Sequence, residues 1–233
     1  MLDLLYPPGC PFCQEKQWHH EICLSCRQEV PVIESPFCLC CGTSLNSQAN
    51  SREQAYCQDC SRRKFAFDNG RSLWIHQGRV MSALYLYKYK NCRMYGKIFA
   101  REWADKLKQQ LMFWDVEVII PVPIHPKRKR KRGFNQADIL ATELSNCTGI
   151  PYQAHVMHRI RDTKPQKGLS ARGRLRNLDG AFGLSRKWQP CSRVLLVDDI
   201  YTTGSTLHYM AKLLKKAGVQ KVFFLTVSIG QDT

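Results

Sequence analysis

The chain has no run of about 18 consecutive apolar residues, so the sequence predicts no membrane-spanning helix. Acidic residues are also scarce, because 19 Asp and Glu stand against 35 Lys and Arg, a formal net charge of +16. Residues 1–12 lack a basic segment before their short apolar stretch, so we expect no secretory signal. Without export the compartment is reducing and disulfides are rare, which favours a cytoplasmic location.

Charge and cysteine are unevenly distributed along the 233 residues. Residues 1–60 hold nine of the twelve cysteines and carry a net charge of −4. Residues 61–233 carry a net charge of +20. This shift in composition predicts two domains, residues 1–65 and residues 66–233. A positive surplus of this size favours a polyanionic partner.

Eight cysteines of the N-terminal segment form four C-x-x-C pairs. The pairs are Cys10/Cys13, Cys23/Cys26, Cys38/Cys41 and Cys57/Cys60. Both sulfurs of such a pair can face one ion, and zinc binds four thiolates in a tetrahedron, so we expect two structural zinc sites. A site formed by pairs that are neighbours in sequence closes the shortest loops. A cross-braced arrangement is the alternative. Cys40 is an alternative ligand because it lies beside Cys41.

The second segment alternates apolar strands with helices. Strands are expected at residues 72–76, 116–122, 194–197 and 219–227, and helices at 80–90, 93–112, 134–147 and 205–216. Buried strands separated by helices predict an α/β domain with a parallel sheet that is covered on both faces.

A phosphate-binding loop is expected directly after the strand at 194–197. Ligands of open α/β sheets bind at the carboxyl ends of the strands, and backbone N–H groups at a helix start can hold a phosphate. The two carboxylates at this position could accept hydrogen bonds from ribose hydroxyls, and they are the candidate catalytic residues. The phosphate-binding candidates are Asp198, Asp199, Thr202, Thr203, Gly204, Ser205 and Thr206.

A run of six cations precedes Gly133. Such a run is expected to be a solvated loop unless a polyanion neutralises it. The candidates for contacts to nucleic acid or pyrophosphate are Lys127, Arg128, Lys129, Arg130, Lys131, Arg132, Arg172 and Arg176. Phe134, Phe182 and Trp188 could stack on bases or pack in the core. His125 could polarise a ligand or simply occupy a turn.

The same cations, together with the aromatic run at 85–90, could contact an anionic membrane surface. Packing of that run in the core, with its lysines extended to solvent, is the alternative.

Residues 193–206 resemble the phosphoribosyl pyrophosphate (PRPP) motif of type I phosphoribosyltransferases. Pro-Val-Pro…Arg-Gly-Phe-Asn-Gln at 121–136, Gln…Leu-Ser…Arg…Asn…Phe at 166–182 and the cysteine block are similar to the ComF family, which is linked to competence and DNA uptake. The resemblance implies a parallel-sheet phosphoribosyltransferase domain preceded by a small zinc-ribbon domain. It also implies PRPP with magnesium, a pyrophosphate loop near residues 121–123 and a mobile loop at 159–177. Tyr201 stands where many family members carry a smaller aliphatic side chain.

Three functions are open on this basis. The leading hypothesis is a cytoplasmic DNA-uptake factor that binds single-stranded DNA, a PRPP-like ligand and other DNA-uptake proteins, and the inner membrane face is an alternative location for it. The alternative is an active phosphoribosyltransferase whose acceptor the sequence does not identify. The third is a regulator that senses PRPP and binds nucleic acid.

Overall fold

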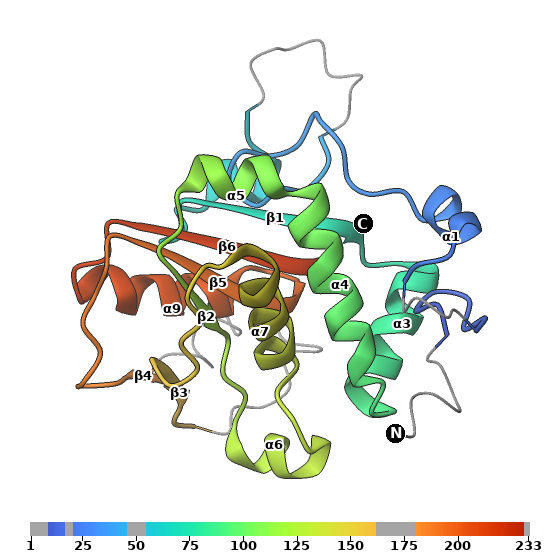
Figure 1. The fold of residues 1–233 in the computed structure, drawn as a ribbon. Coiled ribbons are helices and arrows are strands. Elements are labelled where there is room, and N and C mark those ends of the chain that lie inside the picture. The colour runs from blue at the N-terminus through green and yellow to red at the C-terminus, as the bar shows by residue number, and fades with distance from the viewer. Residues whose placement is uncertain (1–8, 17–20, 46–54, 162–179, 231–233) are drawn as a thin grey trace.

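The computed structural model describes residues 9–16, 21–45, 55–161 and 180–230, and its centre is a four-stranded parallel sheet (Figure 1). In spatial order the strands are β1 (Asn69–Ile75), β6 (Lys221–Ile229), β5 (Arg193–Tyr201) and β2 (Val118–Pro121). The expected α/β domain with a parallel sheet is therefore confirmed. Strand β5 is longer than its apolar core predicts, because it stays paired with β6 through both aspartates as far as Tyr201.

Helices fill the connections between the strands. They are α3 (Gly78–Tyr89), α4 (Arg93–Lys106), α5 (Lys108–Trp114), α6 (Pro126–Arg132), α7 (Gln136–Thr148) and α9 (Ser205–Lys216). Two short helices, α1 (Leu24–Glu29) and α2 (Gln58–Arg62), belong to the cysteine-rich segment. Helix α9 has the expected bounds, and α7 ends as expected at Gly149, which adopts a left-handed conformation.

Two apolar cores cover the two faces of the sheet. Leu195 and Val197 of β5 pack with α3, α4 and α7 in one core. Val194 and Leu196 pack with α9 in the other. Successive residues of a strand point to opposite faces, so a strand that is covered on both sides is a continuous apolar run. That is why residues 194–197 indicate a buried strand in the sequence.

The single helix expected at 93–112 is two helices, α4 and α5. Leu107 leaves the helical conformation, with φ −112° and ψ 16°, and the chain turns there. The turn brings Trp114, at the end of α5, onto Phe223 of β6, where the rings stack with centroids 4.8 Å apart. Burial of the Trp114 ring against the sheet thus accounts for the break, which helical periodicity alone does not indicate.

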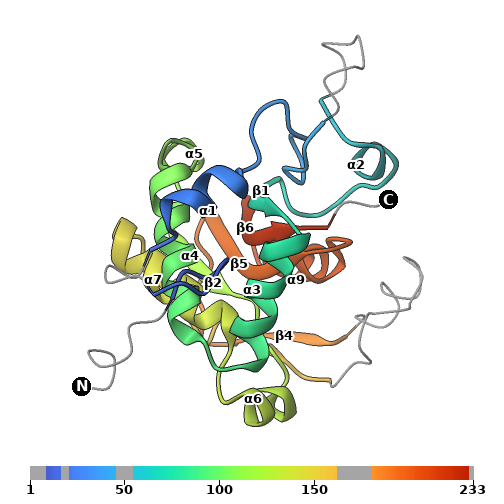
Figure 2. The same ribbon diagram turned by 90° about the vertical axis from the view of Figure 1, so that its right-hand side faces the viewer.

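The cysteine-rich segment covers the β1 edge of the sheet (Figure 2). Cys10 and Cys26 belong to the core on the α4 face, while Cys38 and Cys41 belong to the core on the α9 face. Between them, the Ile33 N–H donates to the Leu73 carbonyl of β1 at 2.6 Å. An exposed strand edge invites pairing with other chains, so this segment also protects the sheet.

Beside the main sheet lies an antiparallel pair that the sequence did not indicate, β3 (Met157–Arg159) and β4 (Phe182–Leu184). Most of the expected mobile loop at 159–177 lies outside the described residues. No helix in the described part of the chain is long and apolar enough to cross a membrane.

Candidate zinc and phosphate sites

The cysteine pairs assemble into two groups of four thiols. The groups are Cys10, Cys13, Cys23 and Cys26, and Cys38, Cys41, Cys57 and Cys60, with the ligand atoms of each group within 4.8 Å of one another. Pairing between neighbours in sequence is therefore confirmed, and the cross-braced alternative is wrong. Cys40 lies outside both groups.

The spacing of the sulfurs fits zinc. A tetrahedron with Zn–S bonds of about 2.3 Å separates its sulfurs by about 3.8 Å. The Cys13 and Cys23 sulfurs are 3.6 Å apart, and the Cys41 and Cys57 sulfurs are 3.7 Å apart. Each group has four protein ligands, so neither leaves an open position for catalysis. Both are structural sites.

Charged residues fasten the first cysteine group to the α/β domain. Arg79, at the start of α3, donates to the Cys26 sulfur at 3.3 Å and pairs with Glu29 at 2.6 Å. Arg27 makes two contacts to the buried Glu102 of α4, at 2.6 and 2.9 Å. A four-thiolate zinc site carries a formal charge of −2, so an arginine against it offsets half of that charge.

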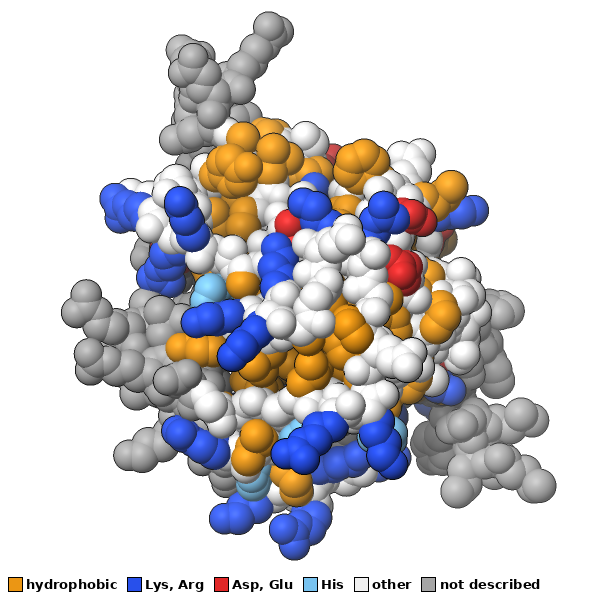
Figure 3. All heavy atoms as spheres, turned by 90° about the vertical axis from the view of Figure 1, so that its left-hand side faces the viewer, with side chains coloured by type: hydrophobic (Ala, Val, Ile, Leu, Met, Phe, Trp, Pro, Cys, Tyr) orange, Lys and Arg blue, Asp and Glu red, His pale blue; other side chains and the backbone are white. Residues whose placement is uncertain are grey.

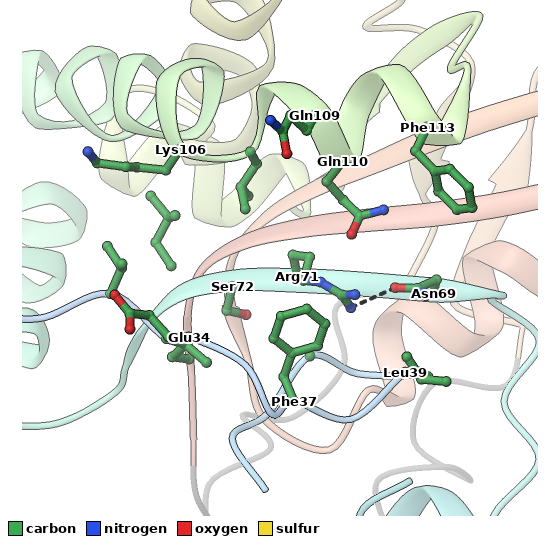
Figure 4. A pocket seen from close by; sticks show the side chains of 15 residues that line it. Glu34, Phe37, Leu39, Asn69, Arg71, Ser72, Lys106, Gln109, Gln110 and Phe113 are labelled. Atoms are coloured by element: carbon green, nitrogen blue, oxygen red, sulfur yellow. Dashed lines mark hydrogen bonds between the residues drawn. The ribbon is translucent and has the colours of Figure 1, made fainter. Parts of the chain in front are cut away.

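A buried arginine joins the second group to β1 (Figure 4). The Arg71 guanidinium carbon lies 3.9 Å from the centre of the Phe37 ring, and its Nη1 donates to the Asn69 side chain at 2.8 Å. Burial lowers the pKa of Arg71 to about 10, and the nearby Cys38 and Cys41 oppose the shift. Arg71 therefore stays charged at neutral pH. It borders a cavity of about 550 Å³ between the cysteine segment and α5.

The two aspartates of the expected phosphate site lie near the carboxyl end of β5. Their surroundings differ, since Asp199 pairs with Lys88 of α3 at 2.9 Å whereas Asp198 accepts the Asp199 backbone N–H at 2.8 Å. Burial, and then the Asp199 charge, raise the pKa of Asp198 to about 7. Asp198 therefore gains or loses its proton near neutral pH, and Lys88 supplies the cation that pairs with Asp199.

The loop after β5 turns directly into α9. Gly204 has φ +67°, and a Cβ there would lie 2.5 Å from the Tyr201 hydroxyl, so only glycine fits. The Thr203 and Ser205 hydroxyls are buried and 3.0 Å apart, so they bond to each other. Thr202 is exposed and can face a ligand. That the backbone N–H groups of this loop hold a phosphate stays a prediction.

Tyr201 supports this loop from within the protein. Its side chain is 6% exposed, stacks on Phe224 with centroids 5.2 Å apart, and meets Phe67 edge-on at 6.3 Å. The larger residue at this position is therefore part of the core beneath Gly204.

The six-cation run is a helix, α6, and the expectation of a loop is wrong. Pro126 begins the helix, the His125 side chain accepts the Lys127 N–H at 3.3 Å, and Gly133 ends it with φ +80°. The three capping residues outweigh the mutual repulsion of the side chains. His125 thus has a structural role as the N-cap. None of the residues of α6 is buried, and Figure 3 shows Lys and Arg side chains gathered at the α6 end of the molecule.

A cavity of about 150 Å³ lies beside the expected pyrophosphate loop. Its polar lining consists of Lys129, Asn135, Asp138, His155, His158 and Arg159. The Asn135 side chain donates to the Val122 carbonyl at 3.1 Å, while its Oδ1 is buried without a hydrogen-bond partner in the described part of the chain. Burial raises the pKa of Asp138. Of the α6 cations, only Lys129 lines this cavity.

The aromatic residues that the sequence suggested for base stacking lie in the core or beside it. Phe134 and Phe182 are buried, so they are core residues, and Trp188 packs partly buried against the α9 core. Arg172 and Arg176 lie outside the described residues. The sequence reading missed Lys88 as the partner of Asp199. No local pattern could have found this pair, because Lys88 and Asp199 lie in segments far apart in the sequence.

Comparisons with known proteins agree with this architecture. The family model described as a double zinc ribbon domain matches residues 1–61, and the one described as a phosphoribosyl transferase domain matches residues 100–229. The chain is 32% identical over 215 residues to Competence protein F of Haemophilus influenzae, covering 86% of this chain and 87% of the relative.

Two further relatives are similar to this chain over different lengths. Competence protein ComFC of Bacillus subtilis is 24% identical over 216 residues, covering 89% of this chain and 86% of the relative. DNA utilization protein YhgH of Salmonella typhi is 41% identical over 104 residues, 45% of each chain. With its double zinc ribbon and phosphoribosyltransferase domain, the chain belongs to the ComF family.

Proposed function

We propose that the chain is a cytoplasmic DNA-uptake factor of natural transformation that binds single-stranded DNA and a PRPP-like phosphate ligand. The observation that carries the proposal is the position of the basic helix. Helix α6 follows β2, which is the neighbour of β5, so α6 and the loop at 202–206 both start from the carboxyl edge of one parallel sheet. The names of the relatives, which refer to competence and DNA utilization, support this proposal.

The phosphate ligand would bind at the carboxyl end of β5. The N–H groups at 202–206 would hold its phosphate, and Asp198 and Asp199 would accept hydrogen bonds from ribose hydroxyls. Carboxylate and phosphate oxygens are the ligands that magnesium prefers, so the two aspartates fit a magnesium ion that accompanies the diphosphate. That ion would neutralise diphosphate charge. Lys129 and Arg159 border the cavity where the diphosphate end would extend, and Arg172 and Arg176 are further candidates.

The exposed cations of α6 would bind the DNA backbone. Neutralising six phosphates of a single strand gives a slope of about −4 for log affinity against log salt concentration. In a variant with Lys127, Arg130 and Lys131 changed to Gln, we expect the slope to become shallower by about 2. The loss should be the same for all sequences, because phosphate contacts carry no base information.

The test is a titration of labelled single-stranded DNA near physiological salt, with and without magnesium and PRPP. A matched control changes Arg186, Lys187 and Lys212 to Gln, which removes the same charge from exposed positions elsewhere. We expect Asp199→Asn to bind single-stranded DNA as the wild type does. Of the two triple variants, only the α6 variant should bind it more weakly. If the wild type binds no single-stranded DNA both with and without magnesium and PRPP, the uptake-factor proposal is refuted.

An active phosphoribosyltransferase is the second candidate. The observation that favours it is the cavity with the unpartnered Asn135 oxygen and the Asp138 carboxyl of raised pKa, since both groups could recognise a polar acceptor. Pyrophosphate release that depends on an added acceptor would support this activity. A PRPP-dependent change in strand affinity would instead support a PRPP-sensing regulator.

Further partners follow from the same surface. The cations of α6 could also contact an anionic membrane face, each adding about 1 kcal/mol. Other DNA-uptake proteins are expected partners because of the competence relatives. Flotation with anionic vesicles in the absence of DNA tests the membrane contact.

A further inference from the structure

Helix α3 presents a line of large apolar side chains to solvent. Met81, Tyr85 and Tyr89 are 53%, 54% and 56% exposed. Residues four apart lie above one another on one helix face, so the three form a single stripe. The opposite side of α3 packs in the core through Val80, Ala83, Leu84 and Tyr87. The helix is thus already anchored, and the exposed stripe contributes nothing to that packing.

At its C-terminal end the stripe meets the basic helix α6. The Tyr85 and Tyr89 rings are in contact, with centroids 5.2 Å apart and an angle of 47° between the planes. The Arg132 guanidinium carbon lies 5.0 Å from the centre of the Tyr89 ring. The two rings and the guanidinium are therefore in contact one after another, and this cluster of Tyr85, Tyr89 and Arg132 is defined here as the stacking surface.

Hydrogen bonds fix the geometry of this surface. Arg132 donates through Nη2 to the Tyr89 hydroxyl at 3.2 Å and through Nη1 to the Gln136 side chain at 3.0 Å. Gln136 is 2% exposed, and its backbone carbonyl accepts a hydrogen bond from the Tyr87 hydroxyl at 2.7 Å. Both terminal nitrogens of the Arg132 guanidinium are thus hydrogen-bonded, and Tyr87 links α3 to the start of α7. A surface ordered in advance loses little conformational entropy when a planar ligand stacks on it.

We propose that Tyr85, Tyr89 and Arg132 form the base-stacking site for single-stranded nucleic acid. Unpaired bases stack on aromatic side chains and on guanidinium planes, while the backbone follows neighbouring cations. Here the neighbouring cations are the other residues of α6, which continue directly from Arg132. A duplex hides the faces of its bases and fits this surface poorly. The proposal rests on the single-strand binding proposed above and assigns it a site.

The stacking surface and the candidate phosphate site share α3 but lie on different sides of it. Lys88 points from α3 to Asp199, with a side chain that is 16% exposed, whereas its neighbour Tyr89 faces solvent. A strand on the tyrosines therefore leaves the two aspartates accessible. We expect PRPP with magnesium not to displace an oligothymidine from the stacking surface.

The experiment compares the wild type with Tyr85→Leu/Tyr89→Leu in fluorescence-anisotropy titrations of labelled oligothymidine. Leucine keeps apolar bulk but removes the aromatic face. We expect affinity to fall about tenfold or more, because each stacked base contributes about 1–3 kcal/mol. The salt dependence should not change, since no phosphate contact is lost. Tyr85→Phe keeps the ring and leaves the hydrogen bond between Arg132 and the Tyr89 hydroxyl intact, so it should bind like the wild type. The control Phe113→Leu, which alters a residue that is 84% exposed on α5, should do the same.

Each failure has a separate meaning. If the wild type does not bind oligothymidine, the proposed single-strand function fails. If the wild type binds and the double leucine variant binds equally well, the stacking site is refuted while the function stands. An abasic oligomer provides a second check, because the double variant should lose no affinity for it. If the double leucine variant no longer binds phosphatidylglycerol vesicles but binds oligothymidine as the wild type does, the stripe contacts a membrane and the proposal is refuted.

Discussion

Replacement of Lys88 by methionine tests the ion pair that orders the candidate phosphate site. The Lys88 nitrogen lies 2.9 Å from the Asp199 carboxylate, and the two side chains are 16% and 12% exposed. At this distance and an effective dielectric constant of about 20, the attraction is about 6 kcal/mol before desolvation is counted. Removing one partner of a buried pair costs about 3–5 kcal/mol, since the other charge is left without compensation.

We expect Lys88→Met to lower the free energy of unfolding by about 3 kcal/mol, the lower end because both groups keep some contact with water. For a chain of this size the melting temperature should fall by about 6–12 °C. The assay is urea unfolding followed by tryptophan fluorescence. The matched control is Lys90→Met, an exposed lysine two residues away, which should change stability by less than about 0.5 kcal/mol.

A double-mutant cycle separates the ion pair from other effects of the substitution. Asp199→Asn removes the charge that Lys88 leaves uncompensated, so the double variant should be more stable than the sum of the two single changes predicts. If Lys88→Met costs no more than Lys90→Met, or if the two changes are additive, the pair does not stabilise the site and the reasoning is wrong.

Three further outcomes are expected. Because the pKa of Asp198 is raised from 3.8 to about 7, the folded protein holds a proton that the unfolded chain has lost, so the stabilising contribution of Asp198 falls as pH rises from about 4 to 7. In urea unfolding, the wild type should therefore lose stability relative to Asp198→Asn over that pH range. Asp199→Asn should abolish PRPP binding in calorimetry while keeping both zinc ions, and wild-type PRPP affinity in this variant would contradict the assigned role. Cys41→Ser should reduce bound zinc, measured by elemental analysis, from about two ions to one per chain, whereas its neighbour Cys40→Ser should keep two.

The strongest sequence signals were those in which chemistry fixes spacing. Four C-x-x-C pairs allow few arrangements of two tetrahedral sites, and the structure has the one with the shortest loops. The apolar run that ends in two aspartates similarly identified a buried strand, because a strand covered on both faces has no polar side. Both features depend on residues close together in the chain.

Features that depend on distant residues were missed or wrong. The break at Leu107 follows from the contact of Trp114 with Phe223, more than a hundred positions further along the chain. The partnership of Lys88 with Asp199 likewise joins segments that no local pattern connects. The basic helix differs from the expected loop for another reason, since its proline, histidine and glycine caps stabilise the helix despite the repulsion among its cations.

Helix α3 brings these elements together within twelve residues. At its start Arg79 contacts the Cys26 sulfur of the first zinc site, and at its end Lys88 holds Asp199. Tyr85 lies between these two residues and Tyr89 follows Lys88. Both tyrosines face outward, and Tyr89 contacts Arg132. A helix of this length spans about 18 Å, so the zinc site, the candidate phosphate site and the stacking surface all contact one rigid element. The zinc ribbon can therefore contribute to function without touching a ligand, because its first site contacts the helix that also carries Lys88 and the two tyrosines.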